Sequence, residues 1–138
     1  MSGIDPVEAE RLRAAGMAIA LHAHEAPDRM AILSRAGDLT YAQLNAGANR
    51  LARALRARGL SRGDSIALFC SNRPEFAIAY AASLRAGLRL TPLNWHLQVD
   101  EATYIVENCE ARAFLADARF REVASAAAEA VPKASVRL

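Results

Sequence analysis

Residues 22–25 contain the densest group of side chains that could bind a metal ion. His22, His24 and Glu25 offer two imidazoles and a carboxylate, which are ligand types of zinc sites. The second half of an H-E-x-x-H motif is missing, however, and a helix would place His22 and His24 on different faces. We therefore expect ordinary solvent-facing histidines and no metal site here.

The two cysteines, Cys70 and Cys109, are the candidate nucleophiles or redox groups of the chain. They lie far apart in the sequence, without a CxxC pattern or an activating partner nearby. A secreted disulfide scaffold would be denser in cysteine, so we expect reduced, buried thiols. The arginines within residues 50–58 could attract an anion, but a solvated helix face is the simpler interpretation.

Two phosphate-binding motifs are absent from the sequence, and a third, catalytic motif lacks the local structure it needs. The sequence contains no G-x-G-x-x-G and no G-x-x-x-x-G-K-[ST], and residues 59–63 match G-x-S-x-G only ahead of a predicted strand, not in the strand-to-helix turn of a hydrolase elbow. The first two would bind phosphates through a glycine-rich loop, and the third would expose a serine nucleophile. The sequence therefore predicts no dinucleotide fingerprint, no Walker-type loop and no hydrolase elbow.

The composition is that of one folded domain. The 138 residues are 53% hydrophobic, and 17 basic residues against 15 acidic ones leave a net charge of +2. That charge is too small to suggest a nucleic-acid partner. No apolar run approaches the roughly 18 residues of a membrane span, and acids and bases mix where a secretion signal needs an apolar stretch. We therefore expect a cytoplasmic protein without a transmembrane segment.

The elements that must position any site begin with a helix and a hairpin. Asp5 and Pro6 have the residue types of a helix start, and the pattern predicts one helix over residues 7–25. Two short apolar runs, 30–33 and 39–41, flank a glycine-containing loop and predict a β-hairpin.

A longer helix and three strand–helix pairs follow. Thr40 and Gln43 have the spacing of a capping box at the start of this helix. Gly59 stands where a C-terminal cap residue in the left-handed conformation is expected. The predicted strands cover residues 65–70, 88–91 (ended by Pro92) and 111–116, and the predicted helices cover about 74–87, 99–108 and 119–130. Residues 135–138 have the pattern of a further strand that is just beginning, so we expect the chain to be truncated.

This order predicts an α/β fold. Strands that alternate with helices form βαβ units, which gives a mostly parallel sheet flanked by helices on both faces, in three layers. An N-terminal helix and a β-hairpin precede the sheet. We divide the chain into an N-terminal helix, 1–28, and a partial α/β subdomain, 29–138, truncated at its C-terminal end.

Taken together, these segments resemble the N-terminal part of the adenylate-forming (AMP-binding) superfamily, which includes acyl-CoA synthetases and peptide-synthetase adenylation domains. The resemblance runs from about Ala26 to Asp117. Its motifs, in order, are Thr40-Tyr41, Ala48-Asn49-Arg50-Leu51-Ala52, Gly63-Asp64, Ala86-Gly87, Pro92 with Asn94, Tyr104 and Asp117. Residues 72–76 and 91–97 look most like the bacterial fatty-acyl and related carboxylate–CoA ligases.

Gln98 departs from the family pattern, which usually has Thr or Ser at this place. Glutamine is a poorer N-cap, so we expect the helix that contains Asp100 and Glu101 to start later, with Asp100 as its cap.

The resemblance implies a two-step reaction of a longer enzyme. A carboxylate attacks the α-phosphorus of ATP to give an acyl-adenylate and pyrophosphate, and the thiol of coenzyme A then displaces AMP. The whole enzyme would use ATP, Mg²⁺ and coenzyme A, with its nucleotide-binding motifs and catalytic lysine downstream of this segment. Lys133 is the only lysine here. The resemblance thus implies an incomplete N-terminal lobe that binds no cofactor, contains no catalytic residue and is inactive by itself.

Asn94, Trp95 and His96 are the candidate residues on the substrate and coenzyme A side, because in related enzymes this loop lies near the coenzyme A entrance. A loop that follows a strand end is also where open α/β sheets place ligands. Alternatively, Trp95 is a packing anchor and His96 a turn residue. The three tyrosines, Tyr41, Tyr80 and Tyr104, are expected to be core residues with a polar tip.

Two other interpretations stay open. The chain could begin a peptide-synthetase adenylation domain that loads a carrier protein, or it could be a stand-alone α/β binding module such as a receiver-like domain. The receiver needs an acid pair after the first parallel strand, where Ser71-Asn72-Arg73 stands. The partners implied for the whole enzyme are a carboxylic acid of the fatty-acid class, ATP and coenzyme A. A truncated sheet would leave an unpaired edge, so we expect the isolated chain to self-associate.

Overall fold

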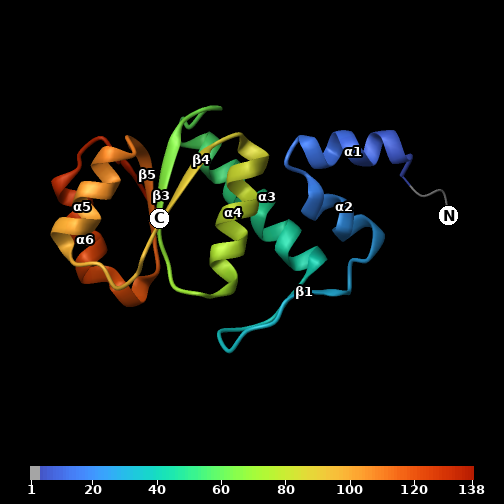
Figure 1. The fold of residues 1–138 in the computed structure, drawn as a ribbon, viewed down its shortest axis with the longest axis horizontal. Helices are drawn as coiled ribbons and strands as arrows, with labels where there is room; N and C mark the ends of the chain where they lie inside the picture. The colour runs from blue at the N-terminus through green and yellow to red at the C-terminus, as the bar shows by residue number, and fades with distance from the viewer. Residues whose placement is uncertain (1–3) are drawn as a thin grey trace. The chain divides into compact units, whose positions relative to one another are not determined.

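The computed structural model describes residues 4–138, drawn as a ribbon in Figure 1. The described chain divides into two compact units, and each is assembled from two separate stretches of sequence. The first unit contains the residues up to Ala54 and residues 73–87, and the second contains residues 55–72 and 88–138. Helix α3 (Tyr41–Ala57) begins in the first unit and ends in the second. The predicted domain boundary after residue 28 stays a prediction. The first three residues of the predicted N-terminal segment, 1–28, lie outside the described residues.

The first unit is mainly helical and the second contains the larger sheet. The other elements of the first unit are α1 (Pro6–Ala14), α2 (Ala18–Glu25), β1 (Met30–Ile32), β2 (Leu39–Thr40) and α4 (Pro74–Ala86). The elements of the second unit are β3 (Ser65–Phe69), β4 (Arg89–Leu93), α5 (Val99–Asn108), β5 (Ala111–Ala116), the 3₁₀ turn η1 (Ala118–Phe120), α6 (Arg121–Ala130) and β6 (Val136–Arg137).

The single helix expected over residues 7–25 is wrong, because two helices, α1 and α2, meet at Gly16. Gly16 has a φ of +74°, and the N–H of Met17 donates to the Leu12 carbonyl at 2.8 Å. This is a Schellman ending, in which a left-handed residue closes the helix. A Cβ on Gly16 would lie 2.9 Å from the carbonyl oxygen of Leu84. The turn between α1 and α2 therefore packs directly against the backbone of α4.

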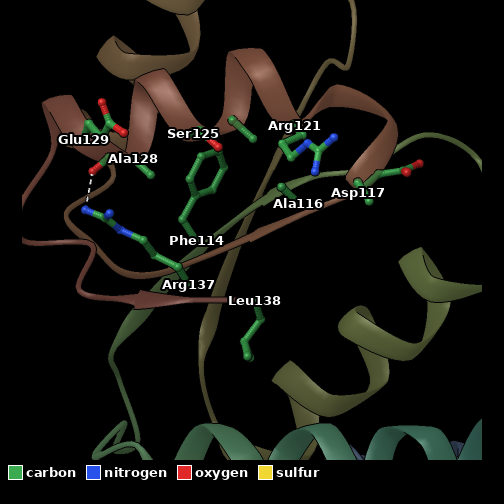
Figure 2. A pocket seen from close by; sticks show the side chains of 11 residues that line it. Phe114, Ala116, Asp117, Arg121, Ser125, Ala128, Glu129, Arg137 and Leu138 are labelled. Carbon is green, nitrogen blue, oxygen red and sulfur yellow. Dashed lines mark hydrogen bonds between the residues drawn. The ribbon is translucent and has the colours of Figure 1, made fainter.

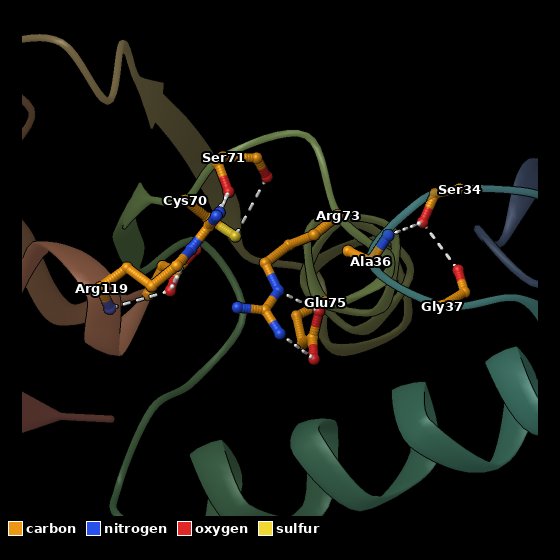
Figure 3. Close-up of polar contacts among 9 residues, drawn as sticks. Ser34, Ala36, Gly37, Cys70, Ser71, Arg73, Glu75 and Arg119 are labelled. Carbon is orange, nitrogen blue, oxygen red and sulfur yellow. Dashed lines mark hydrogen bonds and ion pairs between the residues drawn. The ribbon is translucent and has the colours of Figure 1, made fainter.

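The predicted hairpin and the predicted capping box are both confirmed. Strands β1 and β2 pair antiparallel, with Met30 opposite Thr40. The N–H of Thr40 donates to Oε1 of Gln43 at 2.9 Å, and the N–H of Gln43 donates to Oγ1 of Thr40 at 3.2 Å. In the hairpin loop, Oγ of Ser34 donates to the Gly37 carbonyl at 2.7 Å (Figure 3). Local hydrogen bonds thus set both the turn and the start of α3.

Helices α3 and α4 lie close together within the first unit. A Cβ on Gly47 would lie 2.9 Å from Cδ1 of Ile78, so the absence of a side chain permits this approach. Arg85 of α4 donates to Oδ1 of Asn49 at 2.7 Å and to the Asn45 carbonyl at 3.2 Å. Burial lowers the pKa of Arg85, because desolvation disfavours the charged guanidinium. Apolar packing and a partly buried cation together join the two helices.

The second unit is built on a sheet in the order β4-β3-β5-β6. Each neighbouring pair is parallel, as the alternation of strands and helices predicts. Strand β6 confirms the strand expected in the tail. Strand β4 differs from the expectation for residues 88–91, because it continues through Pro92, which lies opposite Leu68. Proline is tolerated there because β4 is the margin of the sheet within the described residues and pairs only with β3.

Helices α5 and α6 pack on each other and against β5, at the left of Figure 1. Phe69, Val106 and Ala127 are fully buried in the apolar core that these helices form with the sheet. The predicted α/β class, with a parallel sheet flanked by helices, is therefore confirmed. Within residues 4–138, no helix has both the length and the apolar character needed to cross a membrane.

The late start expected for the helix after Gln98 is wrong. Helix α5 begins at Val99, with Gln98 as its N-cap residue. The N–H of Gln98 donates to Oε2 of Glu101 at 3.0 Å. A glutamate three residues after the cap thus satisfies the backbone there, which offsets the weak capping of a glutamine side chain.

Two of the tyrosines expected in the core are exposed instead. Tyr104 is 66% exposed and Tyr80 is 52% exposed. Ala102 and Val106 form the buried face of α5, and Tyr104 lies two residues from each, on the opposite side of the helix. Tyr41 is half-buried, as its expected role requires.

Candidate functional site

Polar and aromatic side chains follow the carboxyl ends of three neighbouring strands in the second unit. Ser71 stands two residues after β3, residues 94–96 follow β4 directly, and Asp117 follows β5 directly. Because these strands are parallel neighbours, their carboxyl ends share one edge of the sheet, where open α/β sheets bind ligands. We call this group the carboxyl-edge site; it consists of Ser71, Asn94, Trp95, His96, Asp117, Arg119 and Phe120.

Asp117 is the buried charge of the carboxyl-edge site, with a side chain that is 1% exposed. Its Oδ2 accepts hydrogen bonds from Oγ of Ser71 and from Nη2 of Arg119, both at 3.0 Å. Its Oδ1 accepts the backbone N–H of Arg119 at 3.0 Å. Arg119 also donates to Oγ of Ser71 (Figure 3). Both carboxylate oxygens thus have donors, as a buried charge requires.

Aromatic rings extend from the sheet core to the surface at this edge. Phe120 packs edge-on against Phe69, with ring centroids 5.6 Å apart, and stacks on Trp95 at 5.5 Å with an interplanar angle of 21°. The His96 ring lies 3.5 Å from the Trp95 ring. Trp95 nevertheless remains 36% exposed. The indole is therefore both anchored and accessible.

The structure brings the three predicted site residues together in one turn. Oδ1 of Asn94 accepts the backbone N–H of His96 at 3.1 Å. The stacking of Trp95 on Phe120 agrees with the packing-anchor alternative, while its exposed surface leaves room for a ligand contact. The ligand-binding role of Asn94, Trp95 and His96 stays a prediction.

Ser71 and Asp117 were not predicted to be site residues, although they form the polar centre of the carboxyl-edge site. The available signal was an acid that ends an apolar strand and a serine that follows a neighbouring strand. Because 46 positions separate the two residues, the sequence alone does not show that they meet.

The histidines and cysteines considered from the sequence have ordinary contacts. Nδ1 of His22 lies 3.9 Å from Oε2 of Glu25. The free thiols of Cys70, which is buried, and Cys109, which is half-buried, donate to backbone carbonyls. Across residues 4–138, no three His, Cys, Asp or Glu side chains gather as metal ligands would.

A second ion pair lies at the opposite, amino edge of the same sheet. Asp64, directly before β3, accepts the N–H of Ser61 and Nη1 of Arg112, both at 2.7 Å. The Ser61 N–H, followed by the Arg112 guanidinium, holds the pKa of Asp64 below its usual range, although desolvation opposes them. This pair closes the turn that starts β3 and offers a matched control for Asp117.

A cavity of about 370 Å³ lies between α6 and strands β5 and β6 (Figure 2). Its lining combines the apolar Phe114 with the polar Arg121 and ends at Asp117. Nη2 of Arg137 donates to the Ala128 carbonyl at 2.6 Å, which is the dashed line in Figure 2. The cavity therefore adjoins the carboxyl-edge site.

The sequence profile of the AMP-binding enzyme family matches residues 19–138. The chain belongs to the AMP-binding enzyme family. The matched segment runs from α2 through the end of the second unit. The family resemblance expected from the ordered motifs is thus confirmed, and the receiver-like interpretation is wrong.

Curated relatives and solved structures give the same family. The chain is 36% identical over 105 residues to a medium/long-chain-fatty-acid–CoA/3-oxocholest-4-en-26-oate–CoA ligase of Mycobacterium marinum, covering 75% of the chain and 19% of that protein. It is 31% identical over 117 residues to the fatty acid–[acyl-carrier-protein] ligase ScoC of Streptomyces coeruleorubidus, covering 85% of this chain and 22% of that protein. A Mycobacterium tuberculosis fatty acyl CoA synthetase structure matches with a TM-score of 0.74 and 29% identity, over 81% of this chain and 23% of that one. The chain therefore spans about a fifth of the length of these relatives.

The AMP-binding family implies a Mg²⁺ ion beside ATP, and the carboxyl-edge site does not fit one. Mg²⁺ takes oxygen ligands in an octahedron. Within the described residues the site offers one carboxylate, Asp117, whose oxygens already accept from Ser71 and Arg119. The carboxyl-edge site therefore lacks the set of oxygen ligands that Mg²⁺ requires.

Proposed function

We propose that this chain is the N-terminal part of an ATP-dependent acyl-CoA synthetase that activates a fatty acid. The observation that carries the proposal is the family match over residues 19–138. The class of acid is supported by the two relatives and the solved structure described above, because each is named for a fatty acid or its acyl group. Since the chain spans about a fifth of those proteins, the reaction is proposed for a longer enzyme.

In this reaction the fatty-acid carboxylate attacks the α-phosphorus of ATP, and pyrophosphate leaves as the bond to the β-phosphate oxygen breaks. The sulfur of coenzyme A then attacks the acyl carbon, AMP leaves with the bonding electron pair, and the thiol proton passes to solvent. Bound Mg²⁺ would neutralise charge on the phosphates. We place this whole enzyme in the cytoplasm, where ATP and coenzyme A are supplied.

We assign Asn94, Trp95 and His96 to the lining of the path for the acyl or pantetheine chain. Small-molecule sites combine aromatic surface with a few polar groups. Trp95, at 36% exposure, offers the first, and the adjacent His96 ring offers the second. The position of these residues at the carboxyl edge of a parallel sheet supports the assignment.

We infer that the 138-residue chain is inactive by itself. Stabilising the charge that develops on transferred phosphates requires cationic and amide donors. Lys133, the only lysine of the sequence, follows α6. The isolated chain is expected to catalyse no ATP–pyrophosphate exchange, and measurable exchange would refute this inference.

A carrier protein is the second candidate acceptor, in place of coenzyme A. The similarity to the Streptomyces acyl-carrier-protein ligase supports it. The two acceptors differ in size, so they can be compared directly in one assay with the same fatty acid and ATP.

The test is a chimera in which residues 19–138 replace the matching segment of the Mycobacterium marinum ligase. We expect the chimera to form fatty acyl-CoA from ATP, coenzyme A and a medium- or long-chain fatty acid. Trp95→Ala in the chimera is expected to raise KM for coenzyme A or the acid. The matched control, Tyr104→Ala, removes another exposed aromatic ring, on α5, and should leave KM unchanged.

Three outcomes of this assay are decisive. A folded chimera that activates no fatty acid would refute the proposed function. Transfer to a carrier protein but not to coenzyme A would favour the second acceptor. Equal KM values for the Trp95→Ala and Tyr104→Ala chimeras would remove Trp95 from the proposed path.

We also propose that the isolated chain self-associates. Within residues 4–138 the sheet ends at β4 and β6, and backbone groups at an open sheet margin can pair with another chain. Sedimentation should therefore show oligomers that grow with concentration. A monomer at high concentration in analytical ultracentrifugation would contradict this proposal.

A further inference from the structure

Phe120 links the buried Asp117 network to the exposed Trp95. Phe120 is the last residue of η1, and its N–H donates to the Asp117 carbonyl at 2.9 Å. Its ring lies against Phe69 on the core side and stacks on Trp95 at 5.5 Å. A rotation of η1 would therefore displace the surface on which the indole rests.

The Asp117 side chain fixes the orientation of η1. Its Oδ1 accepts the backbone N–H of Arg119, which is the bond of an N-cap residue. Nε and Nη2 of the Arg119 guanidinium both donate to Oδ2, at 3.2 and 3.0 Å. Cζ of Arg119 lies 5.5 Å from the centroid of the Phe120 ring, within cation–π distance. The carboxylate therefore orders the backbone of the turn and the cation that lies over the ring.

We propose that Asp117 is a positioning residue of the carboxyl-edge site: through Arg119 and Phe120 it sets the orientation and solvent exposure of the Trp95 indole. Ser71 contributes by donating to Oδ2 of Asp117. In the proposed acyl-CoA synthetase this arrangement sets the width of the acyl or pantetheine path. Only that last consequence rests on the proposed function; the positioning itself does not. The competing explanation is that Asp117 contributes stability alone.

Trp95 fluorescence separates these two explanations. Trp95 is the only tryptophan of the 138-residue sequence, so the emission of the whole chain reports on its environment. Asp117→Asn keeps the side-chain shape and removes the charge. We expect the emission maximum to shift to the red. We also expect the acrylamide quenching constant to rise by at most about threefold, which is the ratio of full exposure to the present 36% exposure of Trp95.

The matched control is Asp64→Asn, which removes an Asp–Arg pair at the opposite edge of the same sheet. Its partner, Arg112, lies at 2.7 Å, so the lost interaction is of the same kind. We expect this variant to keep the wild-type emission maximum and quenching constant. Far-UV circular dichroism of each variant checks that the helices are retained.

A folded Asp117→Asn variant with wild-type emission and quenching would overturn the proposal, and so would an equal change in Asp64→Asn. If Asp117→Asn does not fold, Ser71→Ala takes its place, because it removes only one donor to Asp117. A change in the Trp95 spectrum of Ser71→Ala then supports the proposal, and an unchanged spectrum overturns it. No substrate is needed, so failure of the chimera assay would leave this result intact.

Discussion

Gly16→Ala is expected to destabilise the protein more than the same change at Gly59. The two glycines end α1 and α3 with left-handed φ angles of +74° and +88°. Each is followed by an N–H that bonds the carbonyl five residues back, and these bonds join Met17 to Leu12 and Leu60 to Leu55. Both positions therefore have the same Schellman geometry, and an alanine meets the same backbone penalty at each.

The surroundings of the two glycines differ. A Cβ on Gly16 would lie 2.9 Å from the carbonyl oxygen of Leu84 and 3.0 Å from its carbonyl carbon, which are backbone atoms that cannot rotate away. At Gly59, no atom beyond its two chain neighbours comes within 4 Å of the same position among the described residues. The shared penalty is about 1 kcal/mol once the lower entropy of the unfolded alanine chain is counted. Overpacking against Leu84 adds about 1–3 kcal/mol, so we expect a total of about 2–4 kcal/mol for Gly16→Ala.

Urea and thermal unfolding, followed by circular dichroism, measure this difference. A chain of this size loses about 3–5 °C in Tm per kcal/mol. We therefore expect Gly59→Ala to lower Tm by about 3–5 °C and Gly16→Ala to lower it by at least about 6 °C. Equal losses for the two variants would refute the reasoning, because the contact with Leu84 would then contribute nothing.

Three further substitutions test other parts of the structure. Thr40→Ala removes half of the capping box with Gln43 and should cost about 1 kcal/mol in urea unfolding; a loss near zero would contradict it. Val106→Ala opens a cavity in the core and should cost about 2–3 kcal/mol, against a few tenths for an exposed control such as Tyr104→Ala. Asp64→Asn should flatten the pH dependence of stability at acidic pH. Because the pKa of Asp64 is lowered in the folded protein, its carboxylate stabilises the fold at pH values above 3.8, the ordinary pKa of an aspartate. This contribution to stability is lost as the pH falls through the lowered pKa. Urea midpoints of the two proteins should therefore converge in acid, and parallel pH profiles would contradict the prediction.

Local signals in the sequence predicted most of the elements, because each signal lies within a few residues. The capping box of Thr40 and Gln43 and the left-handed Gly59 bracket α3 as expected. Two of the failures arose where distant parts of the chain decide the outcome. The helix break at Gly16 accompanies a close approach to α4, and Pro92 is accepted because β4 is a sheet margin in the described residues.

The candidate site was predicted in part for the same reason. The loop of Trp95 and His96 was predicted from a family resemblance in which residues 91–97 form one short, local motif. The pairing of Ser71 with Asp117 depends on the register of the sheet, in which Phe69 lies opposite Ala116. That register is set by strand pairing across the chain, which no short motif specifies.

The interleaving of the two units along the chain constrains how the polypeptide can be made and divided. On the ribosome, the first 54 residues emerge before helix α4, which completes their unit, has been synthesised. The second unit has begun by then, because residues 55–72 are translated in between. No single cleavage of the chain yields two whole units, because the chain passes from one unit to the other three times, after residues 54, 72 and 87. Gene fusions, split reporters and circular permutants must therefore be designed with all three of these passages in mind.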